Sequence, residues 1–163
     1  MGKSTDGIPA NSNELSLGGL DRMIGFRLRR VQIVMTRRLA KVSDKHNLTP
    51  GSFPFLALIV ANPGASQSDL AQCVGVDKSA AVAIFDSLEK NGLAIRERSA
   101  RDRRRHQIVP TEKGRALLEE MLAQAYDDER ALVRPLTPAT VASIKASLDQ
   151  LYQLVLGAEQ AEA

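Results

Sequence analysis

The stretch ASQSDLAQCVGVDKSAAVAIFDSLEKNGL, residues 65–93, decides the fold because it has the pattern of two short helices joined by a tight turn. Ser66 is placed to cap the first helix, and Asp77 or Ser79 to cap the second. Gly75 is expected to break the chain between them. The residues that would hold the two helices together are small or apolar: Leu70, Ala71, Val74, Val76, Ala81 and Ile84. This arrangement predicts a helix-turn-helix unit.

A hairpin with an unusually basic tip is predicted directly after this unit. The segments LAIRERS (93–99) and HQIVP (106–110) are short and partly alternating, which is typical of paired strands. From Arg96 to Arg105 there are six arginines against two acids. A hairpin in this position forms the wing of a winged helix. The alternative for the basic segment is a solvated charged loop. The alternative for the two short helices is an ordinary helical hairpin of the core.

Long helices are predicted on both sides of the winged helix. Apolar residues three or four apart indicate a helix over about 17–45, and a further one begins with Thr49 as N-cap and Pro50 at its first position. After the wing, a helix follows Thr111, and Thr137 opens the last one. Its apolar seam, expected to pack on the first helix of the same or a partner chain, is Val141, Ile144, Leu148, Leu151 and Val155.

Charge and composition favour an anionic partner. The 163 residues carry a net charge of only +3, but residues 21–45 sum to +6 and residues 112–163 to −4. A basic region on one part of a surface is typical of nucleic-acid binding. An alternative use of that surface is a helical module that binds an acidic protein.

Catalysis, metal binding and membrane insertion find little support in the sequence. The single cysteine and two distant histidines give no metal-ligand pattern, and the N-terminus lacks an apolar run, so we expect a soluble cytoplasmic protein with no metal and no cofactor. An enzyme would need a pocket around Asp44, His46 and Cys73. No phosphate loop or nucleophile motif accompanies them.

The order of elements and the text of residues 48–117 resemble the MarR family of bacterial transcription regulators, most specifically in Asp102-Arg103-Arg104 followed by Thr111-Glu112-Lys113-Gly114. The resemblance implies a mainly α-helical fold with a small β-hairpin wing. It also implies a homodimeric repressor that binds double-stranded DNA at a palindromic operator and is released by a small aromatic or anionic effector. The expected organisation is a disordered tail (1–16), a helical dimerisation domain (17–47 and 111–157), a winged helix-turn-helix domain (48–110) and a disordered tail (158–163).

The resemblance places residues 78–90 in the major groove as the recognition helix. Ala81, Ile84, Phe85 and Leu88 would face the core, whereas the DNA-facing set would be Lys78, Ser79, Ala80, Val82, Ala83 and Ser87. This set lacks an arginine, so groove shape is expected to carry much of the specificity. In the wing, Asp102 and Arg104 match the residues that shape the loop, and the candidates for DNA contact are Arg101, Arg103 and Arg105.

The resemblance also predicts an effector site. An aromatic acid or its coenzyme A thioester is expected between the two domains, and the candidate residues are Phe26, Arg27, Arg30, His46 and Phe53. The first-helix arginines have two other uses open to them, contact with DNA or plain solvation. Cys73 suggests a redox-sensing regulator as an alternative, but we expect it to pack in the core as a small hydrophobe.

Overall fold

The computed structural model describes residues 16–98 and 106–162, which cluster into two compact units, one ending at Met121 and the other starting at Leu122. In chain order the elements are η1 (Gly18–Arg22), α1 (Ile24–Lys45), α2 (Ser52–Ala61), β1 (Ala65–Ser66), α3 (Gln67–Val74), α4 (Lys78–Lys90), β2 (Ala94–Arg98), β3 (His106–Pro110), α5 (Glu112–Val133) and α6 (Pro138–Glu162). None of the helices in the described part of the chain has the length and apolar character needed to cross a bilayer.

Local sequence signals set the ends of the short helices as predicted. Ser66 Oγ accepts a hydrogen bond from the backbone N–H of Asp69 at 3.1 Å, which caps α3. The Asp77 carboxylate accepts one from the N–H of Ala80 at 2.9 Å, which caps α4. Gly75 ends α3 with φ of +75°, a conformation that costs glycine little. The predicted caps at Ser66 and Asp77 and the predicted break at Gly75 are therefore confirmed.

Two predicted helix starts are wrong. The helix expected from residue 17 is interrupted, because η1 is a 3₁₀ turn and Met23 is extended, so α1 begins only at Ile24. The next helix begins at Ser52, not at Pro50, with Gly51 as N-cap at φ of +89°. Thr49 instead closes the preceding turn, since its carbonyl accepts from the N–H of Ser52 at 3.0 Å.

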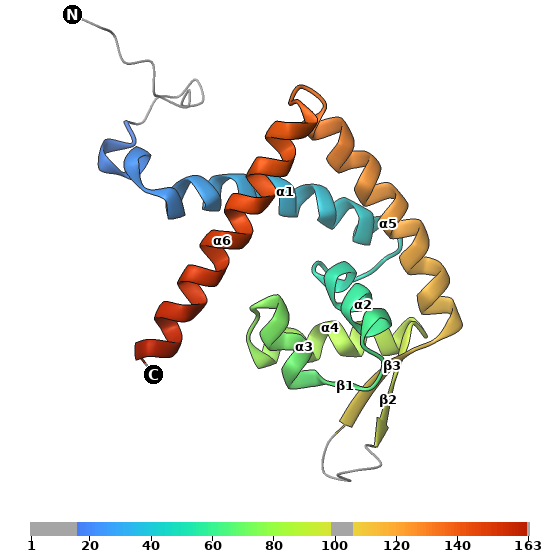
Figure 1. Cartoon of the computed structure of the whole chain (residues 1–163). Coiled ribbons are helices and arrows are strands. Elements are labelled where there is room, and N and C mark those ends of the chain that lie inside the picture. Colours follow the sequence, from blue (N-terminus) through green and yellow to red (C-terminus); the bar gives the residue numbers. More distant parts are fainter. Residues whose placement is uncertain (1–15, 99–105, 163) are drawn as a thin grey trace, which may run out of the picture. The chain divides into compact units, whose positions relative to one another are not determined.

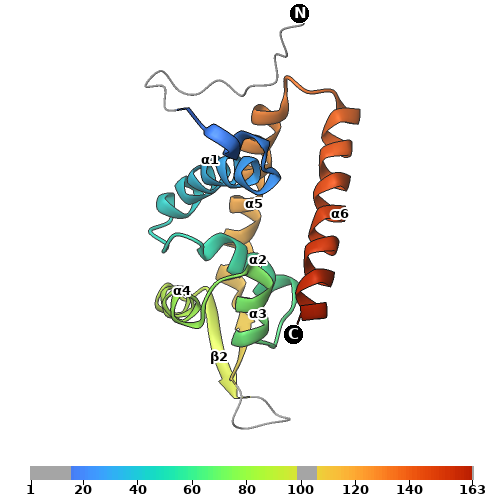
Figure 2. The same cartoon turned by 90° about the vertical axis from the view of Figure 1, so that its left-hand side faces the viewer.

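The sheet has one more strand than the predicted hairpin. β2 and β3 pair antiparallel, with Ile95 opposite Val109, and β1 adds to the other side of β3, giving the order β1-β3-β2. The hairpin runs away from the helices that pack on its base (Figure 2). The β1 strand was missed because two residues show no alternation; their pairing depends on a distant strand.

Helices α2, α3 and α4 pack against the three-stranded sheet, and we call this part of the chain the winged lobe (Figure 1). One hydrophobic core holds the winged lobe together. Phe55 of α2 meets Phe85 of α4 edge to face, with ring centroids 5.1 Å apart and planes at 87°. The other large side chains with almost no exposed surface are Val42, Leu56, Ile59, Leu88, Leu93, Ile108 and Met121. Helix α4 is thus fixed through its inner face.

The second unit, formed by the rest of α5 and by α6, has no buried side chain among its described residues. Helix α6 continues to Glu162, so the prediction of a disordered tail over residues 158–163 is wrong for its helical part, residues 158–162. Gly157 follows the apolar seam and could have ended the helix, but α6 continues through it.

A close backbone approach joins the start of α5 to the turn after α4. The Thr111 hydroxyl donates to the Gly92 carbonyl at 2.8 Å and accepts from the N–H of Gly114 at 3.0 Å. The Thr111 N–H donates to the Leu93 carbonyl at 3.1 Å. A Cβ on Gly114 would overlap the Leu93 carbonyl oxygen. We call this contact, formed by residues 91–93 and 111–114, the α4–α5 joint.

We predict that Gly114→Ala destabilises the fold even though alanine favours a helix. The added methyl meets backbone and cannot be relieved by a rotamer change, so the free energy of unfolding should fall by about 2–3 kcal/mol. Urea denaturation measures this. Gly157→Ala is the matched control, because nothing lies within 4 Å of a Cβ there; equal losses in the two variants would show that the joint is not tightly packed.

Candidate nucleic-acid interface

Helix α4 divides cleanly into an inner and an outer face. Ala81, Ile84, Phe85 and Leu88 are all buried, as predicted. On the outer face, Lys78, Ser79, Val82 and Ala83 are exposed, and Ala80 and Ser87 are half-buried. Val82 leaves 46% of its surface open although it is apolar. The helix therefore presents a surface of small and apolar groups with one lysine at its start.

Two serines of the outer face are already hydrogen-bonded. The Ser79 hydroxyl donates to Asp77 Oδ1 at 2.6 Å, and Ser87 Oγ accepts from the Thr49 N–H at 3.4 Å. The Ser79 hydroxyl, followed by the Ala80 N–H, lowers the pKa of the Asp77 carboxyl below its ordinary value. Asp77 therefore stays ionised as the cap, and the free groups on this face are mainly methyls.

Arg96 of β2 clamps the recognition helix to the sheet. Its guanidinium pairs with Asp86 and, at 2.8 Å, with Glu89, both on α4. Glu89 also accepts from the Arg96 backbone N–H at 3.1 Å. The Arg96 side chain is only 26% exposed, so these contacts are partly shielded from water and fix the angle between helix and hairpin.

In the sequence, Arg96 is one of six wing arginines, and its role as a clamp was not predicted. A signal was present, because Asp86 and Glu89 are three residues apart and so share one face of the helix. The remaining wing residues, Arg101, Asp102, Arg103, Arg104 and Arg105, lie outside the described residues. Their contacts with DNA and with one another stay predictions.

The predicted effector residues are half-buried in the structure: Phe26, Arg27, Arg30, His46 and Phe53. His46 lines a cavity of about 310 Å³ in the first unit, together with Leu48, Asn91, Leu93, Lys113, Ala116, Leu117 and Glu120. The other four candidates do not line that cavity. The five predicted effector residues therefore do not line one common cavity.

Cys73 does not pack in the core; its side chain is exposed. Leu70 and Ala71 form the buried face of α3, and a residue two positions after Ala71 lies about 200° around the helix. The packing prediction is wrong because it assigned Cys73 to the wrong face of a short helix. Within the described residues, no three His, Cys, Asp or Glu side chains gather in a way that could hold a metal ion.

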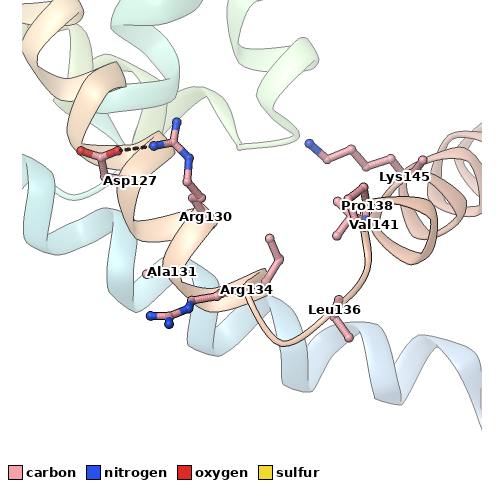
Figure 3. Close-up of a pocket in the computed structure, with 10 residues that line it drawn as sticks. Asp127, Arg130, Ala131, Arg134, Leu136, Pro138, Val141 and Lys145 are labelled. Atoms are coloured by element: carbon pink, nitrogen blue, oxygen red, sulfur yellow. Dashed lines mark hydrogen bonds and ion pairs between the residues drawn. The ribbon is translucent and has the colours of Figure 1, made fainter.

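The apolar seam predicted on α6 is largely open in the single chain. Ile144, Leu148 and Val155 are 45%, 43% and 50% exposed, whereas Val141 and Leu151 are half-buried. Near the turn between α5 and α6, Val141 and Leu136 line a mostly apolar hollow of about 700 Å³ (Figure 3). Its basic residues include Arg130, which pairs with Asp127 at 3.2 Å.

Known proteins share both the sequence and this fold. The family model described as "MarR family" matches residues 46–105. A protein of Thauera aromatica, to which transcriptional regulation of the hcr operon is ascribed, is 35% identical over 150 residues, covering 90% of each chain. The structure of the transcriptional repressor CouR bound to a 23-mer DNA duplex is 32% identical, with a TM-score of 0.76 over 85% of this chain and 99% of that one.

A second structure of a repressor named CouR contains p-coumaroyl-CoA. It is 30% identical to this chain, with a TM-score of 0.74, and covers 85% of this chain and 98% of its own. Each match covers 85% of this chain, which is more than the winged lobe alone, so the likeness includes flanking helices.

Removing the clamp should loosen the lobe. We expect Arg96→Ala to lower the free energy of unfolding by about 1–2 kcal/mol, because two carboxylates lose a partly shielded partner. Urea denaturation of the full chain measures the effect. Arg115→Ala is the control, since its pair with Glu112 is long, at 3.8 Å, and exposed, and such pairs contribute under about 0.5 kcal/mol. Equal effects would mean that Arg96 is no more than a surface charge.

Proposed function

Because the chain belongs to the MarR family of transcriptional regulators, we propose that it acts as a homodimeric repressor, which binds a palindromic operator and is released by a small aromatic or anionic effector. The family is one of DNA-binding transcriptional regulators.

The observation that carries the proposal is the outward face of α4. Its inner face is fully used by the core, whereas Lys78, Val82 and Ala83 remain open to solvent. The basic hairpin follows directly and is fixed to the same helix by Arg96. A helix presented in this way fits a major groove, and a basic wing fits the minor groove beside it.

The chemistry of this face favours recognition through DNA shape. Ala80, Val82 and Ala83 can contact thymine methyl groups, but they cannot form the paired hydrogen bonds that distinguish guanine or adenine. Ser87 is half-buried and engaged with the Thr49 N–H. Arginines of the wing in a narrow minor groove would then supply much of the specificity.

An effector is supported by the similar structure that holds p-coumaroyl-CoA, a bulky anionic aromatic thioester. This chain has a basic first helix that could attract such an anion, since residues 21–45 sum to +6. Oxidation of Cys73 is the alternative trigger. Its exposed thiol is the observation that favours it.

A second copy of the chain is the partner that the exposed apolar residues favour. On α1, Ile24, Val31 and Val34 are 63%, 57% and 50% exposed, and α6 has the open seam described above. A monomer rarely leaves so many large apolar side chains in water. Pairing through these helices would cover them, and it would set two recognition helices for a palindrome.

We expect Arg103→Ala to weaken binding to palindromic DNA from the protein's own promoter and to lower the slope of log K against log salt by about one, because one phosphate or groove contact is lost. Fluorescence anisotropy at several salt concentrations measures both. Arg134→Ala removes the same charge from the turn after α5 and serves as a control. An unchanged slope for Arg103→Ala would count against the wing contact, and no preference for the palindrome would favour an acidic protein partner instead.

Leu148→Asp should convert the dimer to monomers at micromolar concentration, because an unpaired carboxylate would be buried at the interface. Light scattering after size-exclusion chromatography gives the mass directly. Gln150→Asp adds the same charge about 200° around the helix and should leave the dimer intact. A stable Leu148→Asp dimer would move the interface away from this seam.

A further inference from the structure

Strand β2 lies at an edge of the sheet, and helix α4 satisfies its backbone there. Within the described residues, the sheet order β1-β3-β2 gives β2 a neighbouring strand on one side only. The other side of an edge strand presents N–H and C=O groups that lack a partner in the sheet. At Arg96 this N–H donates to Glu89 Oε1 at 3.1 Å. The hairpin is therefore attached to α4 through its backbone as well as through the Arg96 side chain.

The Arg96 guanidinium reaches two positions on that helix. Its Nη1 atom pairs with Glu89 Oε2 at 2.8 Å, and its Nη2 atom pairs with Asp86. The two acids are three residues apart and so lie on one face of α4. Three contacts thus join one residue of β2 to adjacent turns of α4, and together they oppose rotation of the hairpin about the helix. A lysine has the same charge but lacks the planar fork that makes this possible.

The two acids are unfavourable on a helix that faces DNA. Asp86 lies one turn beyond Val82 and Ala83, at spacings of four and three residues, so it continues the outer face. Its side chain is 58% exposed. A negative charge at this place repels DNA phosphates. The contacts with Arg96 give the acids a use that offsets this repulsion.

We propose that Arg96 is a positioning residue for operator binding, which sets the direction of the wing relative to α4 so that both meet their grooves together. A wing that is already aligned loses less conformational freedom on binding than one that pivots. The same alignment restricts the DNA geometries that the protein accepts. This inference rests on the proposed function, because it concerns how the proposed operator contact is made.

Removing the acceptors gives the sharpest test, because charge and alignment predict opposite results. The double variant Asp86→Ala, Glu89→Ala removes two negative charges from the recognition helix, and alanine favours a helix. By charge alone it should bind DNA more tightly than the wild type. We expect it to bind palindromic DNA from the protein's own promoter about tenfold more weakly, because the wing must be ordered on binding. Fluorescence anisotropy at one fixed salt concentration measures this.

The matched control for the double variant is Glu97→Gln. Glu97 is an exposed acid of the same strand and makes none of the three contacts described above. Its removal should leave palindrome binding unchanged or slightly tighter. Equal weakening in the control and the double variant would contradict the inference.

Arg96→Lys and Arg96→Gln test the residue itself. Lysine keeps the charge and glutamine does not, yet we expect both to weaken palindrome binding about tenfold, because neither holds both carboxylates. Binding of Arg96→Lys to a duplex of unrelated sequence should stay near the wild-type value, since the net charge is the same. Arg115→Gln is the control for loss of a charge. Circular dichroism gives the unfolding midpoint of each variant, so that all are compared in the folded state.

A double-mutant cycle with Arg103, the predicted wing contact, separates alignment from stability. If Arg96 aligns the wing, Arg103→Ala should cost much less affinity in the Arg96→Gln background than in the wild type. A purely structural role of Arg96 leaves the two losses independent, and that result overturns the inference. If Arg96→Gln does not fold at the assay temperature, the same cycle is made with Arg96→Lys.

Two further results overturn the inference but leave the proposed function intact, provided that the wild type prefers the palindrome. One is wild-type affinity in Arg96→Lys, which would reduce the residue to its charge. The other is tighter binding by the double alanine variant. A wild type with no preference for the palindrome would refute the proposed function, and this inference with it.

Discussion

The close contact between Gly114 and the Leu93 carbonyl is the constraint on which the lobe depends. It exists because glycine leaves no Cβ between the first turn of α5 and the turn after α4. Thr111 completes it, since one hydroxyl both donates to Gly92 and accepts from Gly114. The helix that leads out of the lobe is therefore attached to the end of the recognition helix by backbone, and side chains only supplement the attachment.

Arg96 holds helix α4 in place from a different side than the α4–α5 joint does. Its pairs with Asp86 and Glu89 orient the sheet against α4, while the joint holds the C-terminal end of that helix. The inner face is packed, with Phe55 against Phe85 at its centre. With three sides fixed, the outer face needs no strong hydrogen-bonding residues to stay in place. The outer face carries small and apolar side chains, and we propose that these recognise DNA through its shape.

The second unit, unlike the winged lobe, has no core within the single chain. It buries none of its described side chains, and its apolar residues are open along α6. A helix with such a face gains stability only when another surface covers it. The lobe can thus reach its packing within one chain, whereas the dimerisation helices we propose require a second copy. Folding of those helices and assembly would then be one event.

The sequence alone determined the features that depend on neighbouring residues. The cap at Ser66, the break at Gly75 and the inner face of α4 follow from residue type and helical period, because each involves contacts within a few positions. For the cap of α4 the sequence left Asp77 and Ser79 open, and the structure selects Asp77. Similarity of residues 48–117 to one family gave the fold and the class of function. It could not give the start of α2, where Gly51 and Thr49 form a turn that competes with the proline signal.

Tertiary structure decided everything that joins distant segments. The β1 strand exists only because β3 offers it a partner, and the clamp exists only because folding brings β2 beside α4. The exposed face of Cys73 depends on how α3 is rotated against the core, which a helix of eight residues does not fix by pattern alone. The cavity at His46 belongs to the same class, since residues 46–48, 91–93 and 113–120 form its walls and no local signal records where they meet.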